Sequence, residues 1–197
     1  MIKKCEIYNE SIKDKLKGKS EADINYILGN MSPINSLDKS ISLNYLEGVK
    51  RAIKRINKII KSDNKPKRLK KQLKDKLHLQ NILDRSVIYS ANIGSLEIIK
   101  YLVEQGAKIQ DESLLEACEY GHLGVVKYLV EYGLDIHYEN DLSLIMASKY
   151  GHLGVVKYLI ENGANIHVQN DTPLFNSINR NKINVVKYLV NKGANIC

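Results

Sequence analysis

One nine-residue stretch occurs twice without a change and determines how the rest of the chain is read. Residues 121–129 read Gly-His-Leu-Gly-Val-Val-Lys-Tyr-Leu, and residues 151–159 repeat them residue for residue. Related versions occupy residues 94–102 and 181–189, so the successive offsets are 27, 30 and 30 residues. Self-similarity at such a period is typical of proteins built from stacked repeats. We therefore place four repeats at about 84–110, 111–140, 141–170 and 171–197.

Each repeat predicts two short helices. Its opening residue is an aspartate, namely Asp84, Asp111, Asp141 or Asp171. A carboxylate at this place can cap the free amides of a helix N-terminus. The first helix is expected to run about eight residues and to end at a Gly or Asn, which suits a left-handed helix end. The second helix has its apolar residues on one face, as at Leu123, Val126, Leu129 and Val130. Neither helix is long enough to be stable alone, so the repeats must stack.

These residues resemble the ankyrin repeat family. The resemblance rests on Thr172-Pro173-Leu174-Phe175, on the two Gly-His-Leu turns and on endings such as Gly163-Ala164-Asn165-Ile166. It implies an all-α fold, an ankyrin-type α-solenoid of stacked helix pairs whose concave face contacts a protein. The family repeat has 33 residues, and the residues missing here fall where the family places its β-fingers. We therefore expect short or absent fingers. The Tyr-, Asn- and Ile-rich style is similar to ankyrin proteins of large DNA viruses.

The N-terminal part is less regular. Residues 44–53 align with residues 181–190, which predicts a degenerate first ankyrin-like repeat at 36–60. From Asn44 to Gly94 the chain is about 20 residues longer than one period, and we assign the excess to a basic helical insertion at 61–82. Residues 1–35 are expected to form an irregular helical N-terminal segment of unknown role.

The net charge of +8 is localised. Residues 1–83 hold 20 Lys and Arg against 9 Asp and Glu, whereas residues 84–197 hold 10 against 13. Residues 50–76 alone carry 13 basic and 2 acidic side chains. The candidate basic patch consists of Lys50, Arg51, Lys54, Arg55, Lys58, Lys67, Arg68, Lys70, Lys71 and Lys74.

This basic stretch has several interpretations. It could bind nucleic acid or an anionic surface, and any such binding would be non-specific and steeply salt-dependent because no aromatic residue is interleaved with the lysines. It could equally be a solvated helix or an import signal. A third interpretation is that it lies against the acidic repeats of the same chain.

No pattern of catalytic or metal-binding residues stands out. Gly18-Lys19-Ser20 lacks the earlier glycine of a phosphate-binding loop. The pairs His122/His152 and His137/His167 lie at equivalent places in successive repeats, about 8–10 Å or more apart, which is too far for one zinc ion. We expect the turn histidines to form a hydrogen bond across the turn between the two helices. Cys118 is expected to be a buried structural thiol. We predict no enzyme, no cofactor and no metal site.

The remaining function is protein binding. Positions that vary between repeats should face outward, and the resemblance places those just before the turn on the concave face. The candidate partner-binding residues are Asn92, Glu119, Tyr120, Lys149, Tyr150, Asn179 and Arg180. The column formed by Tyr101, Tyr128, Tyr158 and Tyr188 is instead expected to pack between repeats. We therefore predict a non-catalytic protein–protein interaction scaffold with an unidentified protein partner, and nucleic-acid binding through 50–76 as the alternative.

The expected setting follows from composition and from the last repeat. Three cysteines at unrelated spacings fit a reducing, intracellular compartment, either the cytoplasm or the nucleus. No apolar run approaches the roughly 18 residues of a membrane span. In the last repeat the second helix keeps the apolar pattern of an internal repeat, although a terminal repeat needs a polar outer side. We therefore expect a monomer, or weak self-association through this C-terminal repeat.

Overall fold

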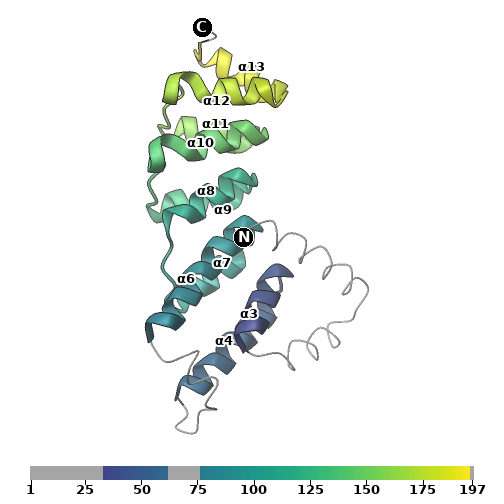
Figure 1. The fold of residues 1–197 in the computed structure, drawn as a ribbon, viewed down its shortest axis with the longest axis vertical. Helices are drawn as coiled ribbons and strands as arrows, with labels where there is room; N and C mark the ends of the chain where they lie inside the picture. Colours follow the sequence, from purple (N-terminus) through teal and green to yellow (C-terminus); the bar gives the residue numbers. More distant parts are fainter. Residues whose placement is uncertain (1–32, 62–75, 196–197) are drawn as a thin grey trace, which may run out of the picture. The chain divides into compact units, whose positions relative to one another are not determined.

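The computed structural model describes residues 33–61 and 76–195 of the chain (Figure 1). All regular elements in these ranges are helices. They are α3 (Pro33–Ser42), α4 (Leu46–Lys61), α6 (Lys76–Asn92), α7 (Leu96–Glu104), α8 (Asp111–Glu119), α9 (Leu123–Tyr132), α10 (Tyr138–Tyr150), α11 (Leu153–Glu161), α12 (Val168–Asn179) and α13 (Ile183–Asn191). The chain divides into two compact units, Met1–Ile82 and Leu83–Cys197, which are described separately below.

The second unit is a stack of helix pairs. Helices α8, α10 and α12 pack side by side in one layer, and α7, α9, α11 and α13 pack in a second layer behind it (Figure 1). One leucine per repeat is fully buried between the layers, at Leu102, Leu129, Leu159 and Leu189. Burying such a side chain stabilises the fold by about 1.5–3 kcal/mol. The predicted all-α solenoid of stacked helix pairs is confirmed.

The turn between the two helices of a pair has the same geometry each time. The backbone N–H of His122 donates to the carbonyl of Ala117 at 2.9 Å, and that of His152 donates to Ala147 at 2.9 Å. The residue before each histidine is a glycine with positive φ, +78° at Gly121. Such a backbone is left-handed and suits glycine because it has no Cβ. The predicted helix ends at these glycines are therefore confirmed.

The connection from one repeat to the next is a left-handed turn in the two longer repeats. Residues 139–141 and 169–171 each have φ between 49° and 58°, although none of them is glycine. The repeat at 84–110 is three residues shorter at this place, and its connection to the repeat at 111–140 has no such turn. No β-finger is present in the described part of the chain, as the short period predicts.

The predicted capping role is wrong for Asp84 and Asp141. Asp84 lies inside α6, which begins eight residues earlier, so the segment predicted as the end of an insertion continues directly into the first repeat. The Oδ1 atoms of Asp84 and Asp141 instead accept backbone N–H groups of Lys108 (2.7 Å) and Asn165 (3.0 Å). Each of these bonds spans 24 residues, because the carboxylate fixes the loop that leads to the next repeat rather than its own helix.

The first unit, in its described part, contains the helix pair α3–α4 and the first residues of α6. The apolar face of α4 is buried, and it consists of Val49, Ala52, Ile53 and Ile56. The turn between the two helices repeats the geometry of the second unit: the N–H of Tyr45 donates to the carbonyl of Ser40 at 2.8 Å, and Asn44 has a φ of 52°. The interpretation of 36–60 as a degenerate repeat stays a prediction, and residues 1–32 and 62–75 lie outside the described residues.

Candidate protein-binding face

The candidate partner-binding residues lie at the ends of first helices: Glu119 ends α8, Lys149 and Tyr150 end α10, and Tyr120 and Arg180 directly follow α8 and α12. We call Asn92, Glu119, Tyr120, Lys149, Tyr150, Asn179 and Arg180 the first-helix face. Tyr120 and Tyr150 are each 38% exposed. The Tyr150 hydroxyl forms a hydrogen bond with the Glu119 carboxylate of the preceding repeat, and Arg180 of the following repeat is close enough to act on the same hydroxyl. The stack therefore brings residues of three repeats into one surface.

Electrostatics at Tyr150 reflect this clustering. Partial desolvation raises the pKa of Tyr150, the negative charge of Glu119 raises it further, and Arg180 opposes both. The Lys149 Nζ lies 5.2 Å from the centre of the Tyr150 ring, and the ring stacks on His152 with 6.5 Å between centroids. The Tyr150 side chain is thus held on several sides while part of it stays open to solvent, which is the arrangement of a preorganised anchor.

Sequence reasoning missed two acidic residues beside this face. Glu112, Glu116 and Glu119 are spaced at i, i+4 and i+7, so they lie along one side of α8. Glu116 Oε2 accepts a hydrogen bond of 2.8 Å from Asn92 Nδ2 on α6. This bond joins the repeat at 84–110 to the repeat at 111–140. The helical spacing was the available signal, but the pairing with Asn92 depends on the stacking of two repeats.

The turn histidines hold successive repeats together. His122 Nε2 lies 2.8 Å from the carbonyl oxygen of Asn92, and His152 Nε2 lies 2.8 Å from that of Glu119. Both acceptors belong to the preceding repeat, so the expected bond across the histidine's own turn is wrong. The His152 ring also packs directly on Gly121 of the preceding repeat, and a Cβ there would collide with it. We call each contact between successive repeats a joint.

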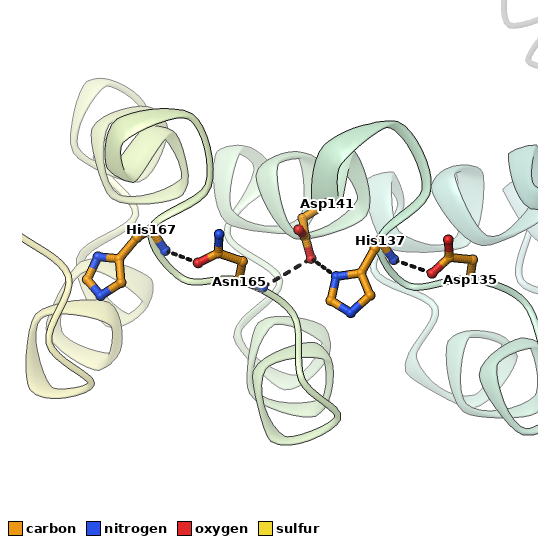
Figure 2. Close-up of polar contacts among 5 residues, drawn as sticks. All are labelled: Asp135, His137, Asp141, Asn165 and His167. Atoms are coloured by element: carbon orange, nitrogen blue, oxygen red, sulfur yellow. Dashed lines mark hydrogen bonds and ion pairs between the residues drawn. The ribbon is translucent and has the colours of Figure 1, made fainter.

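His137 and His167 belong to a polar ladder along the loops (Figure 2). His137 Nδ1 donates to Asp141 Oδ1 at 3.0 Å, and the same oxygen accepts the N–H of Asn165. The Asn165 side chain then accepts the N–H of His167 at 3.0 Å. In the next repeat His167 Nδ1 lies 2.9 Å from Asp171. Because the acceptor is a carboxylate, Nδ1 carries the proton, and each histidine serves its own aspartate rather than a shared metal.

In the tyrosine column, Tyr128, Tyr158 and Tyr188 pack between repeats as expected, and each ring has a lysine over it. Lys100 Nζ lies 5.5 Å from the ring centre of Tyr128, and Lys127 Nζ lies 5.7 Å from that of Tyr158. Lys157 is related in the same way to Tyr188, at 5.6 Å. In each case the lysine belongs to the repeat before the tyrosine. A cation over an aromatic face contributes about 0.5–1 kcal/mol at an exposed site.

Cys118 is fully buried, as the sequence predicts. Burial raises the pKa of the Cys118 thiol to about 12, and a hydrogen bond with Ser143 only partly opposes this. A thiol with such a pKa is protonated at neutral pH and is a poor nucleophile.

The candidate basic patch is only partly within the described residues. Arg51, Lys54 and Lys58 lie on the exposed side of α4, whereas Lys50 donates to Glu47 at 2.8 Å and Arg55 is half-buried. Lys67, Arg68, Lys70, Lys71 and Lys74 lie outside the described residues. Within residues 33–61 and 76–195, no group of three or more His, Cys, Asp or Glu side chains could hold a metal ion. No helix in the same ranges is long and apolar enough to cross a membrane.

The structure has stacked helix pairs, turns with glycine and histidine, and a layer of first helices with an open side. These features define a helical repeat protein. A family model described as ankyrin repeats (three copies) matches residues 58–140 and 139–197. The chain therefore belongs to the ankyrin repeat family, as the resemblance indicates. The match begins within α4, so most of the α3–α4 pair lies outside it. No curated protein matches the chain.

Proposed function

We propose that the protein is a non-catalytic scaffold that binds a partner protein through the first-helix face. Ankyrin repeats generally mediate protein–protein interaction, and the observation that carries the proposal is the cluster of Glu119, Tyr150 and Arg180 from three successive repeats. Tyrosine supplies a large contact area at low entropic cost. The partner stays unidentified. We place the protein in a reducing intracellular compartment because of its unpatterned cysteines.

The test uses two tyrosine variants of matched chemistry. The double variant Tyr120→Ala/Tyr150→Ala removes the proposed anchors. Tyr132→Ala removes a tyrosine that is 53% exposed but lies on α9, in the other layer. Proteins captured from the native cell by the wild type should be lost with the double variant and retained with Tyr132→Ala, since anchor residues commonly contribute about 2 kcal/mol or more to binding. Equal recovery by all three proteins contradicts the assignment of this face.

The alternative function has one supporting observation. Arg51, Lys54 and Lys58 are exposed and spaced at i, i+3 and i+7 on α4, which places three cations on one side of a helix. Such a stripe can lie along phosphates without reading bases. Titration of duplex DNA into the protein at two salt concentrations tests it. Binding that weakens steeply with salt and is reduced by Arg51→Gln/Lys54→Gln/Lys58→Gln supports this function, and a flat response at low salt removes it.

A further inference from the structure

The acidic side of α8 continues the first-helix face toward the loops. Glu112, Glu116 and Glu119 follow one another along this helix, and we call them the acidic stripe. Glu112 is exposed, and the other two are half-buried. Their hydrogen-bond partners are neutral groups: Glu116 accepts from the Asn92 amide, and Glu119 bonds to the Tyr150 hydroxyl. No ion pair in the described part of the chain involves the acidic stripe, so its negative charge is not neutralised there.

The next helix of the layer has an apolar side at the equivalent positions. Leu142 and Met146 of α10 stand 30 residues after Glu112 and Glu116 of α8, at the same places of the repeat. Both are half-buried, and Tyr150 continues the row with 38% of its surface exposed. We call Leu142, Met146 and Tyr150 the apolar stripe. Their spacing of i, i+4 and i+8 keeps them on one side of α10.

The acidic stripe and the apolar stripe form one surface. Helices α8 and α10 pack side by side (Figure 1), and the bond between Glu119 and Tyr150 joins the two rows. Packed helices lie about 8–10 Å apart, which is close to the width of a further helix lying along them. A helix can present two adjacent edges of different chemistry, whereas a strand points successive side chains to opposite faces. The surface therefore fits a helix better than an extended segment.

Further carboxylates extend the negative charge at the loop end of the surface. Desolvation raises the pKa of Tyr138, which begins α10, and the carboxylates of Glu112, Glu139 and Asp111 raise it further. These three carboxylates are thus close enough to act on one hydroxyl group. A partner with cations along α8 would reduce the repulsion among them.

The cations of this surface lie elsewhere. Lys149 Nζ lies 5.2 Å from the centre of the Tyr150 ring, and Arg180 acts on the Tyr150 hydroxyl, so both are at the turn end of α10. In the preceding repeat, the exposed Arg85 stands at the place of Glu112. The negative charge is therefore confined to α8 and the start of α10, beside the apolar stripe.

We propose that the partner of the first-helix face is a basic amphipathic helix of another protein, which lies along α8 and α10. Its lysine and arginine side chains meet the acidic stripe, and its apolar edge covers the apolar stripe. This inference rests on the proposed function, because it names the chemistry of the partner at the same face. Complementary charge selects the partner and fixes its position over α8 rather than α12.

The probe is a capped helical peptide of about 18 residues, with leucines along one edge and lysines along the next. A matched peptide keeps the leucines and has glutamate in place of every lysine. The full chain has a net charge of +8, so its overall charge does not attract a basic peptide. By fluorescence anisotropy, the wild type should bind the lysine peptide at least about tenfold more tightly than the glutamate peptide. This preference should shrink as the salt concentration rises. Equal binding of the two peptides overturns the proposal.

Two triple variants of equal charge change identify the row that attracts the lysines. Glu112→Gln/Glu116→Gln/Glu119→Gln removes the acidic stripe but keeps an oxygen acceptor at each place. Glu104→Gln/Glu131→Gln/Glu161→Gln removes three exposed carboxylates from the second helices α7, α9 and α11. The first variant should weaken binding of the lysine peptide at least about tenfold, and the second should change it by less than about threefold. Equal weakening by both variants shows a general attraction and overturns the proposal.

A double variant tests the apolar stripe. Leu142→Thr/Met146→Asn introduces the residues that the repeat at 171–197 carries at the same places, Thr172 and Asn176. It should weaken binding of the lysine peptide at least about fivefold, because apolar contact is lost. The dependence of binding on salt should stay as in the wild type. Unchanged affinity overturns the position of the helix along α10.

Capture from the native cell separates this inference from the function on which it rests. Partners that Tyr120→Ala/Tyr150→Ala loses but the acidic-stripe variant retains leave the scaffold function in place and overturn the basic helix. Partners that both variants retain count against both. Sedimentation gives the last outcome, since residues 66–78 of this chain are themselves rich in lysine and leucine. We expect no pairing of the wild type; concentration-dependent pairing that the acidic-stripe variant abolishes makes a second copy the occupant and overturns the proposal.

Discussion

The repeats at 141–170 and 171–197 bury almost the same positions within their helix pairs, but they differ in the exposure of other positions. Leu159 and Leu189 are both fully buried, because each packs within its own helix pair. Ile145 and Phe175 occupy equivalent positions of α10 and α12, and only Ile145 is buried. The comparison separates two kinds of core position: those that a repeat buries by itself and those that only its next neighbour buries. Positions of the second kind tie the stability of one repeat to that of the next.

The largest expected effect tests this separation directly. Ile145→Ala removes a buried side chain from a joint and should destabilise the protein by about 2–4 kcal/mol, since a cavity is left between two repeats. Phe175→Ala removes a larger side chain that is half exposed and should cost less than about 1 kcal/mol. Urea unfolding followed by circular dichroism measures both. Equal losses for the two variants would mean that Phe175 is covered in solution.

Much of the fold follows from the sequence because its signals are local. Gly121 and Gly151 mark positions of positive φ, and these depend only on the backbone. The apolar period of the second helices and the 30-residue offset predict stacking without knowledge of any contact. The repeats with a longer segment before the next aspartate, as between Ile136 and Asp141, form a left-handed turn, and the repeat with a shorter segment does not. This difference in length is also visible in the sequence.

The contacts that hold the repeats together were not predictable in the same way. The sequence favours Asp141 as a helix cap, but its carboxylate accepts the N–H of Asn165 from 24 residues away. The turn histidine His152 bonds to a carbonyl of the preceding repeat, although a local rule connects it with its own turn. In both cases the competing partner is close only after two repeats have stacked. The Tyr150–Glu119 bond of the first-helix face has the same origin.

The second prediction compares an internal joint with the joint to the terminal repeat. Gly121→Ala and Gly151→Ala both place a Cβ at positive φ, which costs about 1–2 kcal/mol. At Gly121 the new Cβ also meets the rigid His152 ring, whereas at Gly151 it meets the flexible stem of Lys182. We therefore expect Gly121→Ala to be more destabilising by about 1 kcal/mol. Denaturant unfolding of both variants measures the difference.

A double variant identifies the cause of that difference. His152→Ala removes the ring that collides with the new Cβ, so Gly121→Ala should cost less in the His152→Ala background than in the wild type. The coupling should be absent between Gly151→Ala and His152→Ala. Additive losses at Gly121 and His152 would show that the ring moves aside freely and that the two joints are equally tolerant.

The last prediction concerns the position that is Cys118 in the repeat at 111–140 and Ile178 in the repeat at 171–197. Burial raises the pKa of Cys118 from 9.0 to about 12, so the folded protein keeps the thiol protonated where the unfolded chain loses the proton. Its contribution to stability is complete below about pH 9 and falls as the pH rises toward 12, by up to about 1.4 kcal/mol per pH unit. Between about pH 8 and pH 10 the wild type should lose more stability than Cys118→Ala, whose alanine matches Ala91 of the first repeat. Tyrosines titrate in both proteins, so the difference between the two pH profiles isolates the thiol.

A thiol placed at the exposed position 178 by Ile178→Cys should instead react rapidly at about pH 8. Parallel pH profiles, together with equal thiol reactivity at positions 118 and 178, would show that the two positions do not differ in burial.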